Sequence, residues 1–170
     1  GGGLLSAMDH GKRLRLACIG CGARAQTYTQ LAARRPDEYE IVAGADPVPE
    51  RVEKIRRTSA NPGFRGFPSA EALLGAGKLA DVMIVATQDN FHFEHCRGAL
   101  ERGYDVLLEK PIATTAPQVL EIERLARQAG RRVMVCFVLR FAAFYRKVKE
   151  ILDSGALGEL VSLQASEGVN

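Results

Sequence analysis

The sequence has no continuous apolar run of about eighteen residues, the length that a membrane-spanning helix needs. Its N-terminal region also lacks the charged start and following apolar stretch that are typical of a secretory signal peptide. Both absences argue against a membrane-spanning or secreted protein. The sequence therefore predicts a soluble, cytoplasmic protein.

No block of like charges occurs in the chain. The formal net charge is +3 on 170 residues, and Lys and Arg are interspersed with Asp and Glu. Proteins that bind nucleic acids or anionic membranes commonly carry a concentrated basic patch. We therefore expect neither a nucleic acid nor a membrane as a partner.

Cysteine is scarce, with four residues in the chain. Cys18 and Cys21 form a CxxC pair, but no second pair follows that would complete a zinc site. Disulfide frameworks are typical of small secreted domains, whereas this chain is 46% apolar and can bury a substantial core. We expect free cysteines with packing roles and no metal site.

The order of predicted elements indicates the fold class. Apolar segments of strand length alternate with segments of helical period, which is typical of an α/β fold with a doubly wound parallel sheet. Strands are predicted at 14–19, 40–46, 81–86, 105–108 and 132–138. Helices are predicted at 23–34, 49–58, 69–74, 91–102, 115–130 and 142–153, and a turn-rich connection at 61–68.

Three regions are expected along the chain. Residues 1–11 are interpreted as a leader, with Met8 as a candidate for the natural start, and residues 12–153 as one nucleotide-binding domain. Residues 154–170 are interpreted as the beginning of a truncated second domain, because 159–166 alternates apolar and polar residues like a strand with one wet face.

A glycine-rich loop follows the first predicted strand and opens the first predicted helix. Gly20, Gly22 and Ala25 form the pattern GxGxxA, in which the first Gly permits the tight turn and the second lets the backbone approach a pyrophosphate. Ala25 allows close packing of helix on strand, and the free N–H groups at the helix start favour an anion. Ala23 and Arg24 lie in the same loop, and Arg24 is within reach of a phosphate.

An acidic residue ends the second predicted strand. Asp46 stands where a carboxylate accepts hydrogen bonds from the adenosine ribose hydroxyls and repels a 2′-phosphate, so the sequence favours NAD over NADP. Arg51 lies close enough to bind a 2′-phosphate and keeps NADP as the alternative. Both Arg24 and Arg51 are equally compatible with a solvated helix face.

Three further stretches carry a family resemblance: VMIVATQDNFHFEH at 82–95, YDVLLEKP at 104–111 and VLRFAAFYRKVKEILDSGALG at 138–158. Together with the glycine loop and Asp46, they resemble the Gfo/Idh/MocA family of NAD(P)-dependent sugar and polyol oxidoreductases. The resemblance covers nearly everything from Leu14 to the end of the chain.

The resemblance implies roles for the EKP element. Lys110 would hydrogen-bond the reacting hydroxyl and act as the catalytic residue near the nicotinamide, and Glu109 would sit near the nicotinamide ribose. An ammonium group beside a developing alkoxide stabilises negative charge where it forms, so the chemistry agrees. Pro111 is expected to follow a cis peptide bond. The alternative is that Lys110 only extends into solvent from the strand end.

The resemblance also places Thr87, Asn90, His92 and Arg140 at the cofactor or substrate edge. Gln88 departs from the family's usual proline, which leaves the path of this loop open. A capping or packing role is the alternative for His92, and a surface position is the alternative for Arg140. His92, His95 and Cys96 share a helix face, but no further residue that would complete a metal site is visible in the chain.

The expected activity is hydride transfer between a sugar or polyol carbon and nicotinamide, in a homo-oligomer when the protein is full length. The Asp and His that the family's second domain supplies cannot be assigned in this chain. Two alternatives from the same resemblance remain open: a redox-neutral glycoside-cleaving enzyme that keeps NAD bound, and a non-catalytic dinucleotide-binding regulator. A methyltransferase has a similar glycine loop but does not account for EKP.

Overall fold

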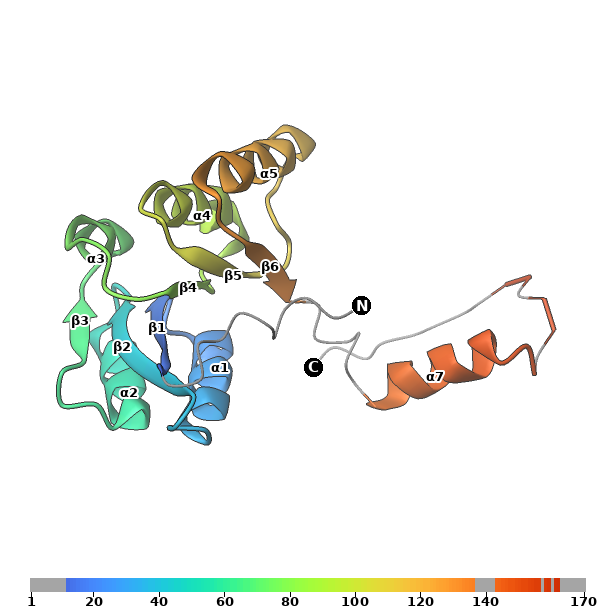
Figure 1. Ribbon diagram of the computed structural model, residues 1–170, viewed down its shortest axis with the longest axis horizontal. Helices are drawn as coiled ribbons and strands as arrows, with labels where there is room; N and C mark the ends of the chain where they lie inside the picture. The colour runs from blue at the N-terminus through green and yellow to red at the C-terminus, as the bar shows by residue number, and fades with distance from the viewer. Residues whose placement is uncertain (1–11, 137–142, 157, 160, 163–170) are drawn as a thin grey trace. The chain divides into compact units, whose positions relative to one another are not determined.

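The computed structural model describes residues 12–136, 143–156, 158, 159, 161 and 162 (Figure 1). The chain divides into two compact units, residues 1–136 and residues 137–170. The first unit contains the sheet and five of the α-helices. The second contains α7 (Ala143–Asp153), followed by a turn at 154–156.

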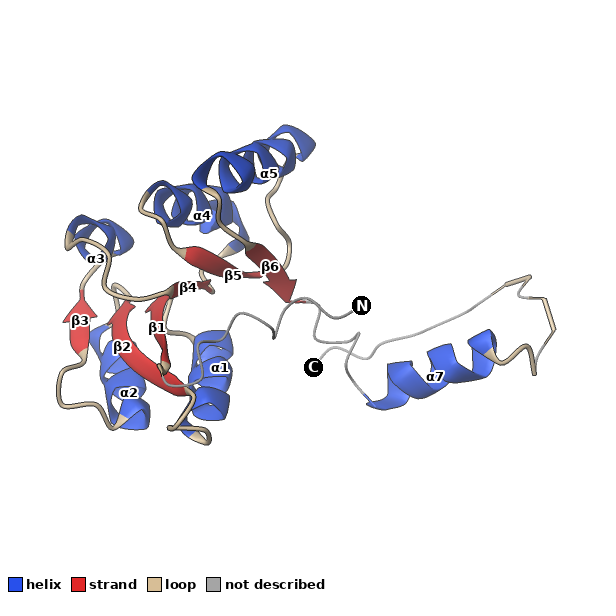
Figure 2. Cartoon of the chain, viewed as in Figure 1, coloured by secondary structure: helices blue, strands red, loops and turns tan. Residues whose placement is uncertain are grey.

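The first unit is built on a six-stranded sheet in the order β3-β2-β1-β4-β5-β6 (Figure 2). Every neighbouring pair of strands is parallel, so all carboxyl ends lie at one edge. The strands are β1 (Leu14–Ile19), β2 (Tyr39–Ala45), β3 (Arg65–Phe67), β4 (Val82–Val85), β5 (Asp105–Glu109) and β6 (Val133–Cys136).

Helices cover both faces of this sheet. On one face, α1 (Ala23–Ala33) and α2 (Pro49–Ser59) contribute to a buried cluster with β1 and β2. On the other face lie α3 (Ala70–Gly75), α4 (His92–Glu101) and α5 (Ala116–Ala129). The predicted doubly wound α/β fold is confirmed.

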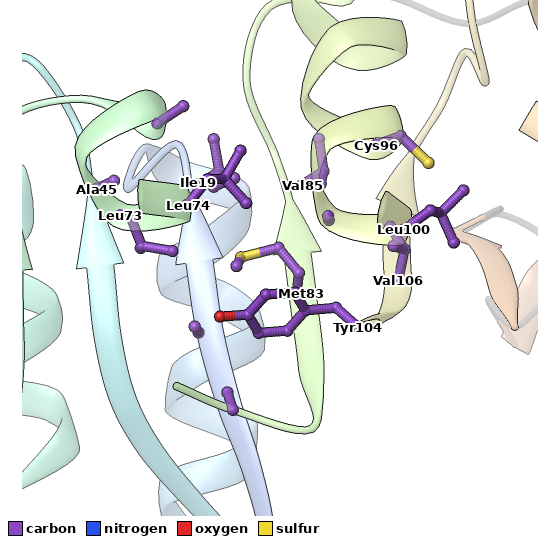
Figure 3. Close-up of a cluster of buried hydrophobic side chains, with 14 of the residues drawn as sticks. Ile19, Ala45, Leu73, Leu74, Met83, Val85, Cys96, Leu100, Tyr104 and Val106 are labelled. Atoms are coloured by element: carbon purple, nitrogen blue, oxygen red, sulfur yellow. The ribbon is translucent and has the colours of Figure 1, made fainter. Parts of the chain in front are cut away.

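The two cores follow from alternation along the strands. Ala17 and Ile19 of β1 belong to the α3–α4–α5 core, whereas Leu16 and Cys18 belong to the α1–α2 core. Figure 3 shows the larger cluster, in which Tyr104 is fully buried beside Met83 and Val106 of the neighbouring strands. Parallel strands buried on both faces read as nearly continuous apolar runs, and the sequence of β4, VMIV, is one of these.

Local sequence accounts for several helix ends. The Ser69 side chain accepts a hydrogen bond from the amide of Ala72 at 3.2 Å and so caps α3. Pro49 occupies the first turn of α2, where its missing N–H is not needed. Gly130 ends α5 in the left-handed conformation, with a φ of 60°.

One predicted segment is wrong. The sequence indicates a turn-rich connection over 61–68, but Arg65–Phe67 forms β3 and pairs with 43–45 of β2. The strand has only three residues at the sheet edge, and its Gly and neighbouring Pro are typical of turns. Backbone pairing with β2, which leaves no trace in local sequence, therefore decides its conformation.

Three predicted elements near the C-terminal end of the chain also need comparison with the structure. Residues 137 and 138 of the predicted strand 132–138 lie outside the described residues, as does most of the predicted strand 159–166. The helix α7, predicted as the last element of the first domain, belongs to the second compact unit. No helix in the described part of the chain is long and apolar enough to cross a membrane.

The α1 face of the sheet is open beyond β4. A hollow of about 650 Å³ lies there, lined by Leu31 of α1, Ile84, Leu107 and Met134 among others. Met134 and Leu31 are each about half exposed. Within residues 12–136, no helix covers β5 and β6 on this side, because α4 and α5 both pack on the opposite face.

Candidate functional site

The candidate site lies at the carboxyl edge of the sheet, where four predicted site segments meet. The glycine loop follows β1, Asp46 follows β2, Thr87 follows β4 and Lys110 follows β5. These strands are consecutive neighbours in the sheet. The chain's connections reverse direction between β1 and β4, and such switch points form the ligand crevice of open α/β sheets.

Gly20 makes the sharp bend out of β1. Its φ of +83° lies in the left-handed region, and a Cβ there would stand 2.6 Å from the carbonyl oxygen of Ala86 at the end of β4. The amide of Gly20 donates to the carbonyl of Ala45 at 2.9 Å, so the bend is held to β2 as well. Only glycine fits this position.

Gly22 has the opposite surroundings. It is the N-cap residue of α1, and a Cβ added to it would meet no atom of the protein within 4 Å. Its backbone therefore faces open space at the start of a helix whose first N–H groups have no side-chain cap. This combination suits an anionic ligand that approaches the backbone closely.

The rest of the loop positions α1 against the sheet. Ala25 is fully buried and packs in the α1–α2 core, so the small side chain allows the close helix–strand approach that GxGxxA predicts. Ala23 and Arg24 lie in the first turn of α1 and are exposed. Arg24 has its side chain free to reach a ligand at the helix start.

Asp46 is buried, and both of its carboxylate oxygens accept backbone hydrogen bonds. Oδ2 accepts from the amide of Cys21, and Oδ1 accepts from the amide of Val48, each at 2.9 Å. A carboxylate oxygen has two acceptor positions, so each retains one for a ligand hydroxyl. Arg51 Nη1 lies 3.9 Å from Oδ2, and its side chain is 55% exposed.

The glycine loop, the segment after β2 and the loop after β4 line one cleft of about 500 Å³, whereas Glu109 and Lys110 are not among its lining residues. Five predicted site residues contribute to it: Gly20, Gly22, Asp46, Arg51 and Thr87. Sequence reasoning missed other lining residues, including Ser69, Glu71, Phe91 and His95. The volume and the mixed lining are suited to the adenosine and diphosphate portion of a dinucleotide.

The loop after β4 forms one wall of this cleft. The Thr87 hydroxyl lies 3.0 Å from Nδ1 of His95, and the ring of His95 stacks on Phe91 with centroids 5.7 Å apart. Burial lowers the pKa of His95. Phe91 and His95 could have been paired from the sequence, because residues four apart share a helix face. Asn90 is exposed and does not line the cleft.

His92 joins two loops of the site. Its ring is fully buried, with Nε2 at 3.0 Å from the carbonyl oxygen of Thr87 and Nδ1 at 2.7 Å from that of Pro111. The imidazole thus connects the loop after β4 to the turn that follows β5.

The EKP element occupies the tip of β5. Glu109 is the last residue of the strand and is 6% exposed, Lys110 is exposed, and the Lys110–Pro111 peptide bond is cis as expected. The hydroxyl of Tyr28, on α1, donates a hydrogen bond to Oε1 of Glu109. Arg140 lies outside the described residues.

The structure shows the state of the four cysteines and, for the described residues, whether side chains gather as metal ligands. Cys18, Cys21, Cys96 and Cys136 are all free, and burial raises the pKa of Cys96 and of Cys21 to about 12 each. Within the described ranges, no three His, Cys, Asp or Glu side chains gather as a set of metal ligands.

A parallel sheet with a glycine-rich loop at a helix start, an acid on the next strand tip and a cleft between them defines a dinucleotide-binding Rossmann domain. Residues 14–137 match the model of the Gfo/Idh/MocA oxidoreductases with an NAD-binding Rossmann fold. The chain belongs to this family.

Curated relatives agree with this assignment. Inositol 2-dehydrogenase 3 of Saccharopolyspora erythraea is 32% identical over 146 residues, covering 85% of this chain and 42% of the relative. D-glucoside 3-dehydrogenase of Escherichia coli is 33% identical over 147 residues, covering 86% of this chain and 41% of the relative. The chain thus spans less than half the length of these two relatives.

A solved structure has the same fold. The WlbA dehydrogenase from Bordetella pertussis, in complex with NADH and UDP-GlcNAcA, superposes with a TM-score of 0.76 at 26% identity. The match covers 86% of this chain and 44% of that one.

Proposed function

We propose that the chain is the nicotinamide-binding part of a dehydrogenase that oxidises or forms a hydroxyl-bearing carbon of a sugar or polyol. The observation that carries the proposal is the meeting of the glycine loop, Asp46 and Thr87 in one cleft, with Lys110 on the adjacent strand tip. The names of the relatives, an inositol dehydrogenase and a glucoside dehydrogenase, support the substrate class.

The residues present fit a dinucleotide. The space in front of Gly22 and the first-turn N–H groups of α1 would receive the diphosphate, with Arg24 beside them. Asp46 would accept from the adenosine ribose hydroxyls, which favours NAD, while Arg51 would contact a 2′-phosphate if NADP were bound. Thr87, Asn90 and His92, together with Arg140, complete our assignment of the cofactor and substrate edge.

Lys110 is our assignment for the catalytic residue. A bound nicotinamide supplies the site that accepts or donates hydride. The ammonium group of Lys110 stabilises negative charge on the substrate oxygen, which eases removal of the hydroxyl proton. His92 holds the following turn through Pro111, so the Lys110 backbone is anchored to the wall of the cleft.

The test separates binding from turnover. Turnover is measured on the natural full-length protein with inositols and methyl glucosides, by the absorbance of NADH. We expect Lys110→Met to reduce kcat by at least about a hundredfold and to leave the affinity for NAD⁺ within about twofold, because Lys110 acts on the substrate. The exposed Lys54→Met on α2 is the matched control.

Two outcomes would contradict the proposal. One is a Lys110→Met variant with wild-type kcat on the substrates that the wild type oxidises. The other is a wild-type protein that binds nicotinamide dinucleotides but releases no NADH with any member of the panel.

Compartment and assembly are further parts of the proposal. We place the protein in the cytoplasm, because all four of its thiols are free in the folded structure and a reducing compartment keeps them so. We also propose a homo-oligomer for the full-length protein, on the family resemblance alone. Light scattering on the full-length protein tests this, and a monomer at micromolar concentration would contradict it.

A further inference from the structure

We propose that Tyr28 is a positioning residue for the nicotinamide end of the site: it orients the carboxylate of Glu109 so that one oxygen receives the second ribose of the dinucleotide. The inference rests on the proposed function. It adds a residue on α1 that no sequence motif singled out, and it links the diphosphate helix to the strand that carries Lys110.

The burial of Glu109 makes its hydrogen-bond partner important. The residue is 6% exposed, and a buried carboxylate is costly unless it accepts hydrogen bonds. Among the described residues, the Tyr28 hydroxyl is its one hydrogen-bond donor, and no Lys or Arg forms an ion pair with it. The phenol therefore sets the orientation of the carboxylate.

The geometry of β5 explains how the two side chains meet. Leu107 and Glu109 lie on the same face of the strand, and Leu107 packs in the α1–α2 core. Glu109 therefore faces α1, where Tyr28 is one turn beyond the buried Ala25. Since the phenol binds Oε1, Oε2 is the oxygen left for a ligand.

The phenol stays a donor over the usable pH range. Burial raises the pKa of Tyr28, and its contacts with Cys136 and Glu109 raise it further. Cys136 is the register partner of Glu109 on β6, and burial raises the pKa of its thiol. Both neighbours of the carboxylate are thus neutral near pH 7, and the Tyr28 hydroxyl keeps the proton that it donates to Oε1.

The location selects the part of the ligand that Glu109 meets. Asp46 and the cleft of about 500 Å³ lie at β1, β2 and β4, on the side of the glycine loop where the adenosine is proposed. Glu109 lies one strand beyond β4 and directly before Lys110. A dinucleotide bound with its adenosine at the first location and extending to the second would bring its second ribose to Glu109.

The experiment compares three ligands on the chain by isothermal titration: NAD⁺, ADP-ribose and ADP. The first two contain the second ribose and ADP does not. We expect Tyr28→Phe to weaken NAD⁺ and ADP-ribose about three- to tenfold, the value of one hydrogen bond, and to leave ADP within twofold. Glu109→Gln should show the same pattern, and the double variant should be no weaker than the weaker single variant.

Tyr39→Phe is the matched control, because Tyr39 is half-buried on β2 and its hydroxyl has no hydrogen bond among the described residues. It should leave all three affinities unchanged. Equal losses for ADP and NAD⁺ in Tyr28→Phe would show a structural effect on the loop and overturn the assignment, as would unchanged NAD⁺ binding. A wild-type chain that binds none of the three ligands would overturn the proposed function, and this assignment with it.

Discussion

Asp46 holds the glycine loop: its Oδ2 accepts the backbone amide of Cys21 at 2.9 Å, across 25 residues of sequence. Its Oδ1 accepts the amide of Val48 and so orders the turn that leads into α2. The carboxylate assigned to the adenosine ribose therefore also braces the backbone assigned to the diphosphate. We therefore expect cofactor preference and loop geometry to be coupled through this one side chain.

Asp46→Asn tests this coupling. An amide group has one oxygen, so only one of the two backbone N–H groups keeps its acceptor, and we expect a loss of about 1–3 kcal/mol in the free energy of unfolding. Loss of the negative charge should also raise the NADP⁺/NAD⁺ affinity ratio at least about tenfold. Urea denaturation and titration calorimetry measure the two effects. Unchanged stability would show that the two hydrogen bonds contribute little.

Arg51→Ala tests the effect of a nearby charge on cofactor preference without removing the hydrogen bonds that Asp46 accepts from the backbone. Arg51 is 55% exposed and 3.9 Å from Asp46, so its removal should change the free energy of unfolding by less than about 0.5 kcal/mol. We expect NADP⁺ affinity to fall and NAD⁺ affinity to remain within twofold. Equal losses for both cofactors would contradict the assignment of Arg51 to the 2′-phosphate.

Gly22→Ala and Gly20→Ala should fail in different ways. A Cβ at Gly22 meets no protein atom, so we expect normal stability and an NAD⁺ affinity lowered at least about tenfold, since the methyl occupies ligand space. A Cβ at Gly20 collides with Ala86, and its φ of +83° adds strain of about 1–3 kcal/mol. Unlike Gly22→Ala, the Gly20→Ala variant should therefore have a lower free energy of unfolding. A Gly22→Ala variant with wild-type affinity for NAD⁺ would contradict the assignment of this loop as the diphosphate site.

Tyr104→Phe is predicted to destabilise the sheet core. The buried hydroxyl accepts the amide of Leu79 at 2.8 Å and donates to the carbonyl of Gly77 at 3.0 Å. Phenylalanine leaves both backbone groups without their partner, which should lower the free energy of unfolding by about 1–3 kcal/mol. Denaturation curves measure the change against Tyr39→Phe, whose hydroxyl has no partner among the described residues and which should be nearly neutral.

Asp105 should contribute a pH-dependent part of the stability. Burial raises the pKa of Asp105, but hydrogen bonds from the Arg132 amide at 2.8 Å and from its guanidinium at 3.0 Å outweigh it and hold the pKa below its usual value. A lowered folded-state pKa stabilises the protein above the unfolded-state pKa, and this contribution disappears as pH falls through the folded-state value. Asp105→Asn should therefore lose less stability than wild type below about pH 4.

The matched control is Asp37→Asn, because Asp37 is exposed and has no hydrogen bond among the described residues. It should retain the acid sensitivity of the wild type. An Asp105→Asn variant whose stability falls as steeply as that of wild type on acidification would contradict the contribution assigned to this carboxylate.

Much of the fold follows from local sequence, and β1 with α1 shows why. LRLACI gives a buried strand, the glycines give the bend, and Ala25 gives the close packing, so each step has a local chemical cause. The edge strand β3 has no such cause, since Arg65–Phe67 is extended through pairing with β2. The site divides in the same way. Gly20, Asp46 and Glu109 belong to recognisable patterns, whereas Tyr28 lies 81 residues from Glu109 in sequence and meets it only through the fold.

Titration of the chain with NAD⁺ and NADP⁺ by isothermal calorimetry, alongside Gly22→Ala, is the most direct test of the central claim. The account predicts saturable binding at one site per chain, tighter for NAD⁺ than for NADP⁺, and a marked loss in a stable Gly22→Ala variant. Absence of binding for both cofactors, or equal binding by wild type and Gly22→Ala, would contradict it.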